Sequence, residues 1–181
     1  MRTLLSALGF MVVVGLLVPA AGGAVQILRP EGGDGVEILE TDRVARMRLA
    51  LPVGRELAFD AWTQAGHLVE WLPHWVEMQV AEGEGFTMGW DGYDGEWSGT
   101  YLEVDRPERL VFTWVVPDGV FPSGVNETVV TLTFEEVEEG RTSVLLEHSG
   151  FGDSAELESQ LQAWRGYLFA LRAHLLRPTS D

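Results

Sequence analysis

The stretch Gly95–Val116 most constrains how this chain can fold, because it has the pattern of two strands joined by a short polar turn. In its second run, large apolar side chains alternate with smaller ones such as Thr113, which is typical of a sheet that buries one face. The apolar positions are Leu110, Phe112, Trp114 and Val116. Pro107 has no N–H to donate, which suits a turn and not the centre of a strand. We predict that this hairpin is the middle of a curved sheet enclosing a pocket.

The hairpin lies within a series of strand-like segments separated by short turns. A long strand is predicted over Val36–Leu51. Later strands are predicted at Val76–Val80, Phe86–Trp90, Trp97–Val104, Arg109–Val116, Thr128–Glu135 and Thr142–His148. Successive strands with short turns indicate an antiparallel meander. The apolar residues of the longer Pro117–Asn126 loop indicate tucked-in packing or, less commonly, a lid.

Three helices are predicted around these strands. Arg55–Ala65 carries apolar side chains at i, i+1, i+4, i+5 and i+8, and Gly66 is expected to separate it from a second short helix, His67–Leu72. The chain ends in a long helix, Ser154–Leu176, with Ser154 as the predicted N-cap. Its apolar stripe consists of Leu157, Leu161, Trp164, Leu168, Leu171 and Leu175. Such a stripe covers a sheet more simply than it forms a coiled-coil seam.

The order of these elements predicts an α+β fold in one domain. A strand, two short helices, a run of strands and a long helix describe a curved antiparallel sheet wrapped around the C-terminal helix. With 181 residues the chain is long enough for one compact core. We assign the domain to residues 36–178 and a Gly-rich, flexible lead-in to residues 25–35.

Residues 1–24 are typical of a secretory signal. Arg2 provides the positive charge, Leu4–Val18 is the apolar stretch, and Pro19–Ala24 contains small residues suited to cleavage after Ala20 or Ala24. An uncleaved anchor is the alternative, although the apolar stretch is shorter than the roughly 20 residues of a spanning helix. Both interpretations predict an exported protein, periplasmic or secreted.

Composition excludes several classes of function. The chain has a formal net charge of -16, with 12 basic residues that are all Arg, which argues against nucleic-acid binding and against docking on anionic lipid. The absence of Cys excludes disulfides, thiol nucleophiles and thiolate metal sites. We find no Gly-x-Ser-x-Gly elbow, no His-Glu-x-x-His and no phosphate-binding Gly loop, so no cofactor is predicted.

Two blocks of the sequence carry a family resemblance. The first runs from Leu51-Pro52-Val53 through Ala58-Phe59-Asp60-Ala61-Trp62-Thr63 to Leu68 and Trp71, and the second is Gly99–Trp114, GTYLEVDRPERLVFTW. The second is similar to the Gly-x-x-x-Glu-hydrophobic-x-x-Pro-x-Arg-Leu hairpin of one family in the SRPBCC (START-like, helix-grip) superfamily. That family is named for activators of the heat-shock-protein-90 ATPase.

The resemblance covers roughly residues 44–176 and implies a helix-grip fold with a deep pocket between sheet and long helix, often occupied by an apolar ligand. An exported protein would not meet a cytosolic ATP-dependent chaperone, so the activity in the family name is not carried over.

The candidate pocket residues are the apolar side chains expected on the concave face together with one histidine. They are Trp71, Met88, Trp90, Leu102, Phe112, Trp114, Leu132, His148, Trp164 and Leu168. Aromatic side chains suit flat apolar ligands, although the same residues could fill a core. The faces of Trp97–Val104 are left open, because Leu102 and Tyr101 point to opposite sides. We expect Phe112 and Trp114 to meet Trp164 and Leu168.

Two sets of histidines are candidates for chemistry. His148 is expected on the concave face, as a ligand partner, as a general base or, the interpretation we favour, as a residue satisfied by its neighbours. His67, Glu70 and His74 have the spacing of metal ligands on one helical face. Pro73 breaks that helix, so we favour an exposed polar face over a metal site.

The sequence thus predicts an exported SRPBCC-domain protein that binds a small hydrophobic or amphipathic ligand. An enzyme using the same pocket with His148 as base, and a protein-interaction module using the sheet or the Pro117–Asn126 loop, are the alternatives. Converging polar side chains in the pocket would favour the enzyme. A filled core with an exposed apolar patch would favour the interaction module.

Overall fold

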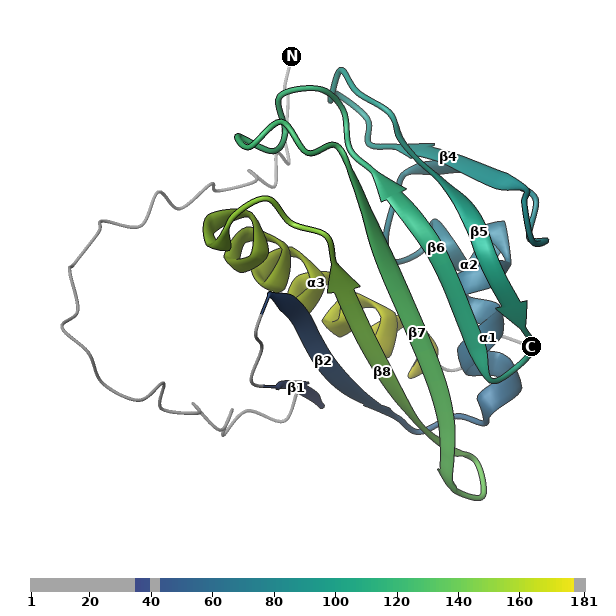
Figure 1. The fold of residues 1–181 in the computed structure, drawn as a ribbon. Helices are drawn as coiled ribbons and strands as arrows, with labels where there is room; N and C mark the ends of the chain where they lie inside the picture. The colour runs from purple at the N-terminus through teal and green to yellow at the C-terminus, as the bar shows by residue number, and fades with distance from the viewer. Residues whose placement is uncertain (1–34, 40–42, 178–181) are drawn as a thin grey trace, which may run out of the picture.

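The computed structural model describes residues 35–39 and 43–177, and Figure 1 shows their fold. The predicted signal segment and nearly all of the lead-in lie outside the described residues. Eight strands and three helices follow the order β1 (Val36–Ile38), β2 (Val44–Leu51), α1 (Arg55–Thr63), α2 (Ala65–Leu68), β3 (Trp75–Met78), β4 (Gly85–Gly89), β5 (Trp97–Asp105), β6 (Arg109–Val115), β7 (Glu127–Glu138), β8 (Arg141–Ser149) and α3 (Ser154–Leu175).

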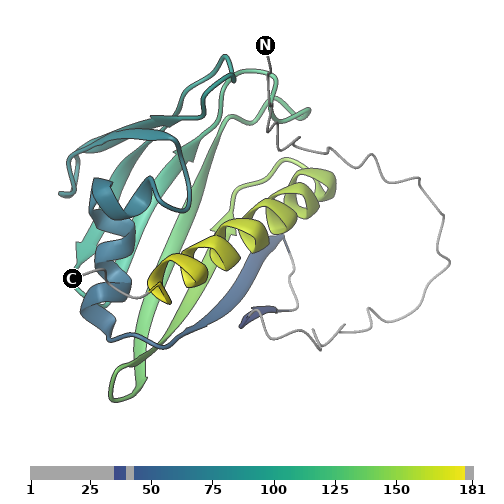
Figure 2. The same ribbon diagram turned by 180° about the vertical axis from the view of Figure 1, so that it is seen from behind.

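The strands form one antiparallel sheet in the order β1-β2-β8-β7-β6-β5-β4-β3. Strands β3 to β8 are a meander, and β2 pairs with β8, so the first long strand joins the last one. All three helices lie on one face of the curved sheet, with α3 crossing it diagonally and α1 and α2 beside it (Figure 2). The predicted α+β helix-grip fold is confirmed.

Three of the differences from the predicted elements are a divided strand, a helix break and a helix cap. The single predicted strand over 36–51 is two strands, β1 and β2, that pair with each other. The break between α1 and α2 lies at Gln64, whose extended backbone ends α1, while Gly66 lies inside α2. Asp153, not Ser154, caps α3, because its carboxylate accepts a hydrogen bond of 2.9 Å from the Glu156 N–H.

The apolar stripe of α3 covers the sheet as predicted. Trp164, Leu168 and Leu171 are buried, and Leu161 and Leu175 pack partly buried against the core. The opposing side chains on β2 and β8 are fully buried and comprise Met47, Leu49, Val144 and Leu146. Each buried Leu of this interface contributes about 1.5–3 kcal/mol, so helix and sheet depend on each other for a core.

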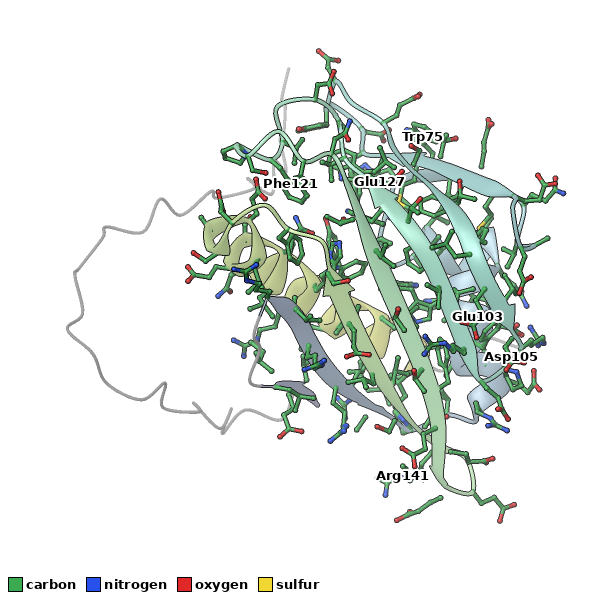
Figure 3. The ribbon with its side chains drawn as sticks, in the orientation of Figure 1. Trp75, Glu103, Asp105, Phe121, Glu127 and Arg141 are labelled. Atoms are coloured by element: carbon green, nitrogen blue, oxygen red, sulfur yellow. The ribbon has the colours of Figure 1, made fainter. Side chains whose placement is uncertain are left out.

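The β5–β6 hairpin is attached to α1 by charged side chains. Glu103 and Arg109 pair across the hairpin at 2.9 Å, and Arg106 in the turn reaches Asp60 and Glu56 on α1. The hydrogen bond from Arg106 holds the pKa of Asp60 below its usual range. Figure 3 shows Glu103 at this end of β5. The polar residues of the family-like hairpin therefore position a helix.

The β6–β7 loop, residues 116–126, is packed against the start of α3. Phe121 is buried, and its ring centroid lies 6.0 Å from that of Phe151. Figure 3 labels Phe121 in this loop. The Ser123 and Gly152 N–H groups donate to the buried Glu156 carboxylate at 2.8 and 2.9 Å. Burial would raise the pKa of Glu156, but these hydrogen bonds outweigh burial and lower it. The packed alternative for this loop is confirmed.

A glycine in β5 allows two strands and a phenyl ring to meet closely. A Cβ on Gly99 would overlap the Thr113 carbonyl oxygen of β6 and the Phe86 ring of β4. We therefore expect Gly99→Ala to lower the free energy of unfolding by about 2 kcal/mol or more, because the strand backbones would have to separate. Chemical denaturation monitored by tryptophan fluorescence measures this change.

Gly66→Ala in α2 is the matched control. A Cβ there would meet nothing within 4 Å, and Ala is favoured over Gly in a helix. We expect this substitution to be neutral or slightly stabilising. Equal destabilisation by the two substitutions would contradict a role for close approach at Gly99.

Candidate functional site

A small cavity lies between the α1–α2 segment and strands β4, β5 and β6. Its volume is about 20 Å³, and it is lined by Trp62, Leu68, Leu72, Phe86, Met88, Tyr101, Leu110, Phe112 and Trp114. This volume holds about one water molecule, whereas pockets for small ligands commonly reach several hundred Å³. Most of the space that the sequence predicted as a pocket is therefore filled by aromatic side chains.

The predicted pocket residues divide into three groups. Met88, Phe112 and Trp114 line the cavity. Leu132, His148, Trp164 and Leu168 are buried in the adjoining core beneath α3. Trp71 and Trp90 anchor the wall formed by α2 and the segment after it, because their indole N–H groups donate to the Ala61 and Leu72 carbonyl oxygens at 3.0 and 2.8 Å. The predicted meeting of Trp114 with Trp164 is confirmed by ring centroids 5.4 Å apart.

The prediction that Leu102 lines the pocket is wrong. It is 51% exposed, whereas its neighbour Tyr101 is buried and lines the cavity. The pairing of β5 with β6 shifts register between Tyr101 and Glu103. A bulge of this kind interrupts the strict alternation of faces, so the alternation alone could not assign the side chains.

Six cavity residues were absent from the sequence-based set. They are Trp62, Leu68, Leu72, Phe86, Tyr101 and Leu110. Phe86 and Leu110 share strand faces with Met88 and Phe112, so alternation could have identified them. The three residues from α1, α2 and the following segment could not be identified in this way, since no sequence signal says that these helices close the cavity.

His148 belongs to a chain of hydrogen bonds that crosses the core. The Trp164 indole N–H donates to its Nδ1 at 2.9 Å, and its Nε2 lies 2.7 Å from the Thr128 hydroxyl. That hydroxyl donates its proton to the Trp114 carbonyl oxygen at 3.0 Å, so it accepts from His148. One tautomer, with the proton on Nε2, satisfies every bond. The favoured interpretation, a histidine satisfied by its neighbours, is confirmed.

This arrangement does not suit a general base. The ring of His148 is fully buried, and its free lone pair at Nδ1 is taken by Trp164. Burial lowers the pKa of His148 to about 3. A base needs an accessible lone pair near the reacting proton, so the geometry argues against the enzyme that used His148.

The other histidines pair with residues that the sequence did not suggest. His67 on α2 lies 3.0 Å from His174 near the end of α3, measured between Nδ1 and Nε2. Glu70 pairs with Arg177, and His74 accepts the Asp91 N–H at 2.9 Å. Across residues 35–39 and 43–177, no three His, Asp or Glu side chains are grouped so that they could hold a metal ion. The same residues include no helix long and apolar enough to span a membrane.

Comparison with known families decides where this fold belongs. The model of the family described as "Activator of Hsp90 ATPase homolog 1-like protein" matches residues 52–175, which include the α1 block, the β5–β6 hairpin and α3. The chain belongs to this family. The resemblance found in the sequence is thereby confirmed. No curated protein matches the chain.

Several solved structures share the fold at low sequence identity. Protein MLL2253 from Mesorhizobium loti is 24% identical with a TM-score of 0.68, covering 77% of this chain and 100% of its own. An HSP90 activator, PFC0360w from Plasmodium falciparum, is 21% identical with a TM-score of 0.63, covering 76% and 99%. The Aha1 dimer from Colwellia psychrerythraea is 17% identical with a TM-score of 0.62, covering 76% and 98%. These likenesses support the fold.

The buried state of His148 leads to a pH dependence of stability. The unfolded chain takes up a proton on this residue near its ordinary pKa of 6.5, whereas the folded protein resists protonation down to about 3. Stability therefore falls as the pH drops through this window, and we expect a loss of about 2 kcal/mol between about pH 7.5 and about pH 5. Urea denaturation at a series of pH values measures it.

Non-titrating variants separate His148 from the other groups. His148→Gln should remove most of this loss of stability. Burial also lowers the pKa of His174, so a smaller loss in the same direction should remain. His74→Gln changes an exposed histidine and should keep the full slope. A slope in His148→Gln as steep as in the unaltered protein would contradict the assignment.

Proposed function

We propose that this protein is exported and binds a small apolar molecule between the α1–α2 segment and strands β4 to β6. The observation that carries the proposal is the cavity at this place, bordered by aromatic and aliphatic side chains with Tyr101 as the one hydroxyl among them. Such a lining favours apolar ligands through burial of their surface. No charged side chain borders it, which favours binding over hydrolytic or acid–base chemistry.

Entry of a ligand requires one wall to move outward. Leu68 and Leu72 contribute to the wall that begins with α2, a helix of four residues. That wall is held by side-chain interactions: the His67–His174 hydrogen bond, the Glu70–Arg177 ion pair, and the indole N–H groups of Trp71 and Trp90 on the Ala61 and Leu72 carbonyl oxygens. A sheet strand is held on both sides by a backbone ladder, whereas this wall depends on a small number of side-chain interactions, so we infer that it opens at a lower free-energy cost than the sheet.

Hsp90 activation is not proposed for this chain. That activity belongs to PFC0360w, a structural neighbour at 21% identity, a level that supports only the fold. The signal-like residues 1–24 favour an exported location, where a cytosolic chaperone would be absent.

A cavity-filling variant tests the ligand site. Met88 lines the cavity, and Met88→Phe would fill it with a ring of slightly greater volume. We expect the unaltered protein to bind 2-ethylnaphthalene saturably by titration calorimetry, and Met88→Phe to weaken this binding at least about ten-fold with unchanged or higher Tm.

Met78→Phe makes the same change on the edge strand β3, where Met78 packs against the core outside the cavity lining. It should leave the affinity unchanged. Absence of saturable binding to the unaltered protein, or equal effects of the two substitutions, would count against this site.

Export has its own test in the native host. We expect the protein to fractionate with the exported material and its N-terminus, by mass spectrometry, to begin at Ala21 or Val25. A protein that begins at Met1 and fractionates with the cytosol would overturn the export proposal and leave the ligand site untouched.

A further inference from the structure

The buried tryptophans differ in whether their indole N–H groups are satisfied. Trp71 donates to the Ala61 carbonyl oxygen, and Trp164 donates to His148. Trp62 and Trp114, each only 3% exposed, have buried Nε1 atoms without a hydrogen-bond partner among the described residues. Both of these tryptophans line the cavity, whereas Trp71 and Trp164 do not.

The two unsatisfied indoles share one neighbour in the core. Each packs against the Trp164 ring, with centroid distances of 5.9 Å for Trp62 and 5.4 Å for Trp114. A buried N–H without an acceptor is destabilising, and natural cores rarely retain one. Both residues that carry such an N–H line the same cavity, which points to a hydrogen-bond acceptor inside it.

The lining restricts what that acceptor can be. A water molecule fits the volume but needs acceptors for its own protons, and the only side chain of the lining that could accept is the Tyr101 hydroxyl. A carbonyl oxygen needs donors alone. A carboxylate would be buried without a cation, since no Arg or His borders the cavity. A cationic group such as an ammonium has no lone pair to accept hydrogen bonds from the two indole N–H groups, so it would leave them unsatisfied.

We propose that the cavity binds an uncharged molecule that places one carbonyl oxygen between the Trp62 and Trp114 N–H groups and its apolar body where the α2 wall opens. This inference rests on the proposed function and adds the chemical class of the ligand, a neutral ketone or amide with a hydrophobic body. The Tyr101 hydroxyl, whose pKa burial raises, stays protonated and is a further donor from the same lining.

Three probes of one shape test the inference on the purified full chain. They are 2-acetylnaphthalene, 2-ethylnaphthalene and 2-naphthoate, which carry a ketone, no acceptor and a carboxylate. We expect the ketone to bind about ten-fold tighter than the ethyl compound, and the carboxylate to bind most weakly. Trp62→Phe and Trp114→Phe should each lower the ratio of the ketone affinity to the 2-ethylnaphthalene affinity, measured on the same variant.

Trp71→Phe is the matched control. It removes an indole N–H that is already bonded to a carbonyl oxygen, so it should lower stability while the ketone preference persists. Because variants can fail to fold, the unaltered protein provides a second measurement. The indole N–H resonances of Trp62 and Trp114 should shift downfield with the ketone and not with the ethyl compound.

The outcomes separate the two proposals. Equal affinities for the ketone and the ethyl compound, with both indole resonances unmoved by the ketone, would overturn the carbonyl inference and leave apolar binding intact. Absence of binding by all three probes would overturn the proposed function and this inference together. A ketone preference that survives both Trp62→Phe and Trp114→Phe would mean that the ketone oxygen accepts its hydrogen bonds from other groups. That outcome would also overturn the inference.

Discussion

The docking of α3 on the sheet is the constraint on which the rest of this structure depends. Apolar burial provides most of the free energy, but burial is not directional. The chain of hydrogen bonds from Trp164 through His148 and Thr128 to the Trp114 carbonyl oxygen supplies the direction. It links the helix to β8, β7 and β6 in turn, so a sliding or rotated helix would leave several buried polar groups unsatisfied.

That fixed half of the core contrasts with the half beneath α1 and α2. On the α3 side, inward residues such as Leu146 and Leu168 are fully buried and the polar atoms of the network are paired. Beneath α1 and α2, a cavity and two unsatisfied indoles occur together. Packing efficiency and polar satisfaction are normally maintained throughout a core. Loose packing and unpaired polar groups occur together at this place, beside a four-residue helix, which is the physical basis for proposing a ligand site there.

The family-like hairpin has a structural role that its sequence did not reveal. Its Glu103–Arg109 pair lies across the strands, and Arg106 bridges to Asp60 and Glu56 on α1. The two blocks that carry the family resemblance are therefore in contact in space. These motifs hold the wall of the cavity in place, and none of these charged side chains borders the cavity itself.

By itself, the sequence determined the α+β class, the meander, the helix-covered concave face and the family, because alternation, helical periodicity and two local motifs are properties of neighbouring residues. It also placed Met88, Phe112 and Trp114 at the cavity. Only the tertiary structure decided that Leu102 faces outward at a bulge and that His148 is satisfied by Trp164 and Thr128. It also decided that the indole N–H groups of Trp62 and Trp114 have no partner among the described residues. These outcomes depend on which distant groups meet, and a pattern along one strand or helix does not contain that information.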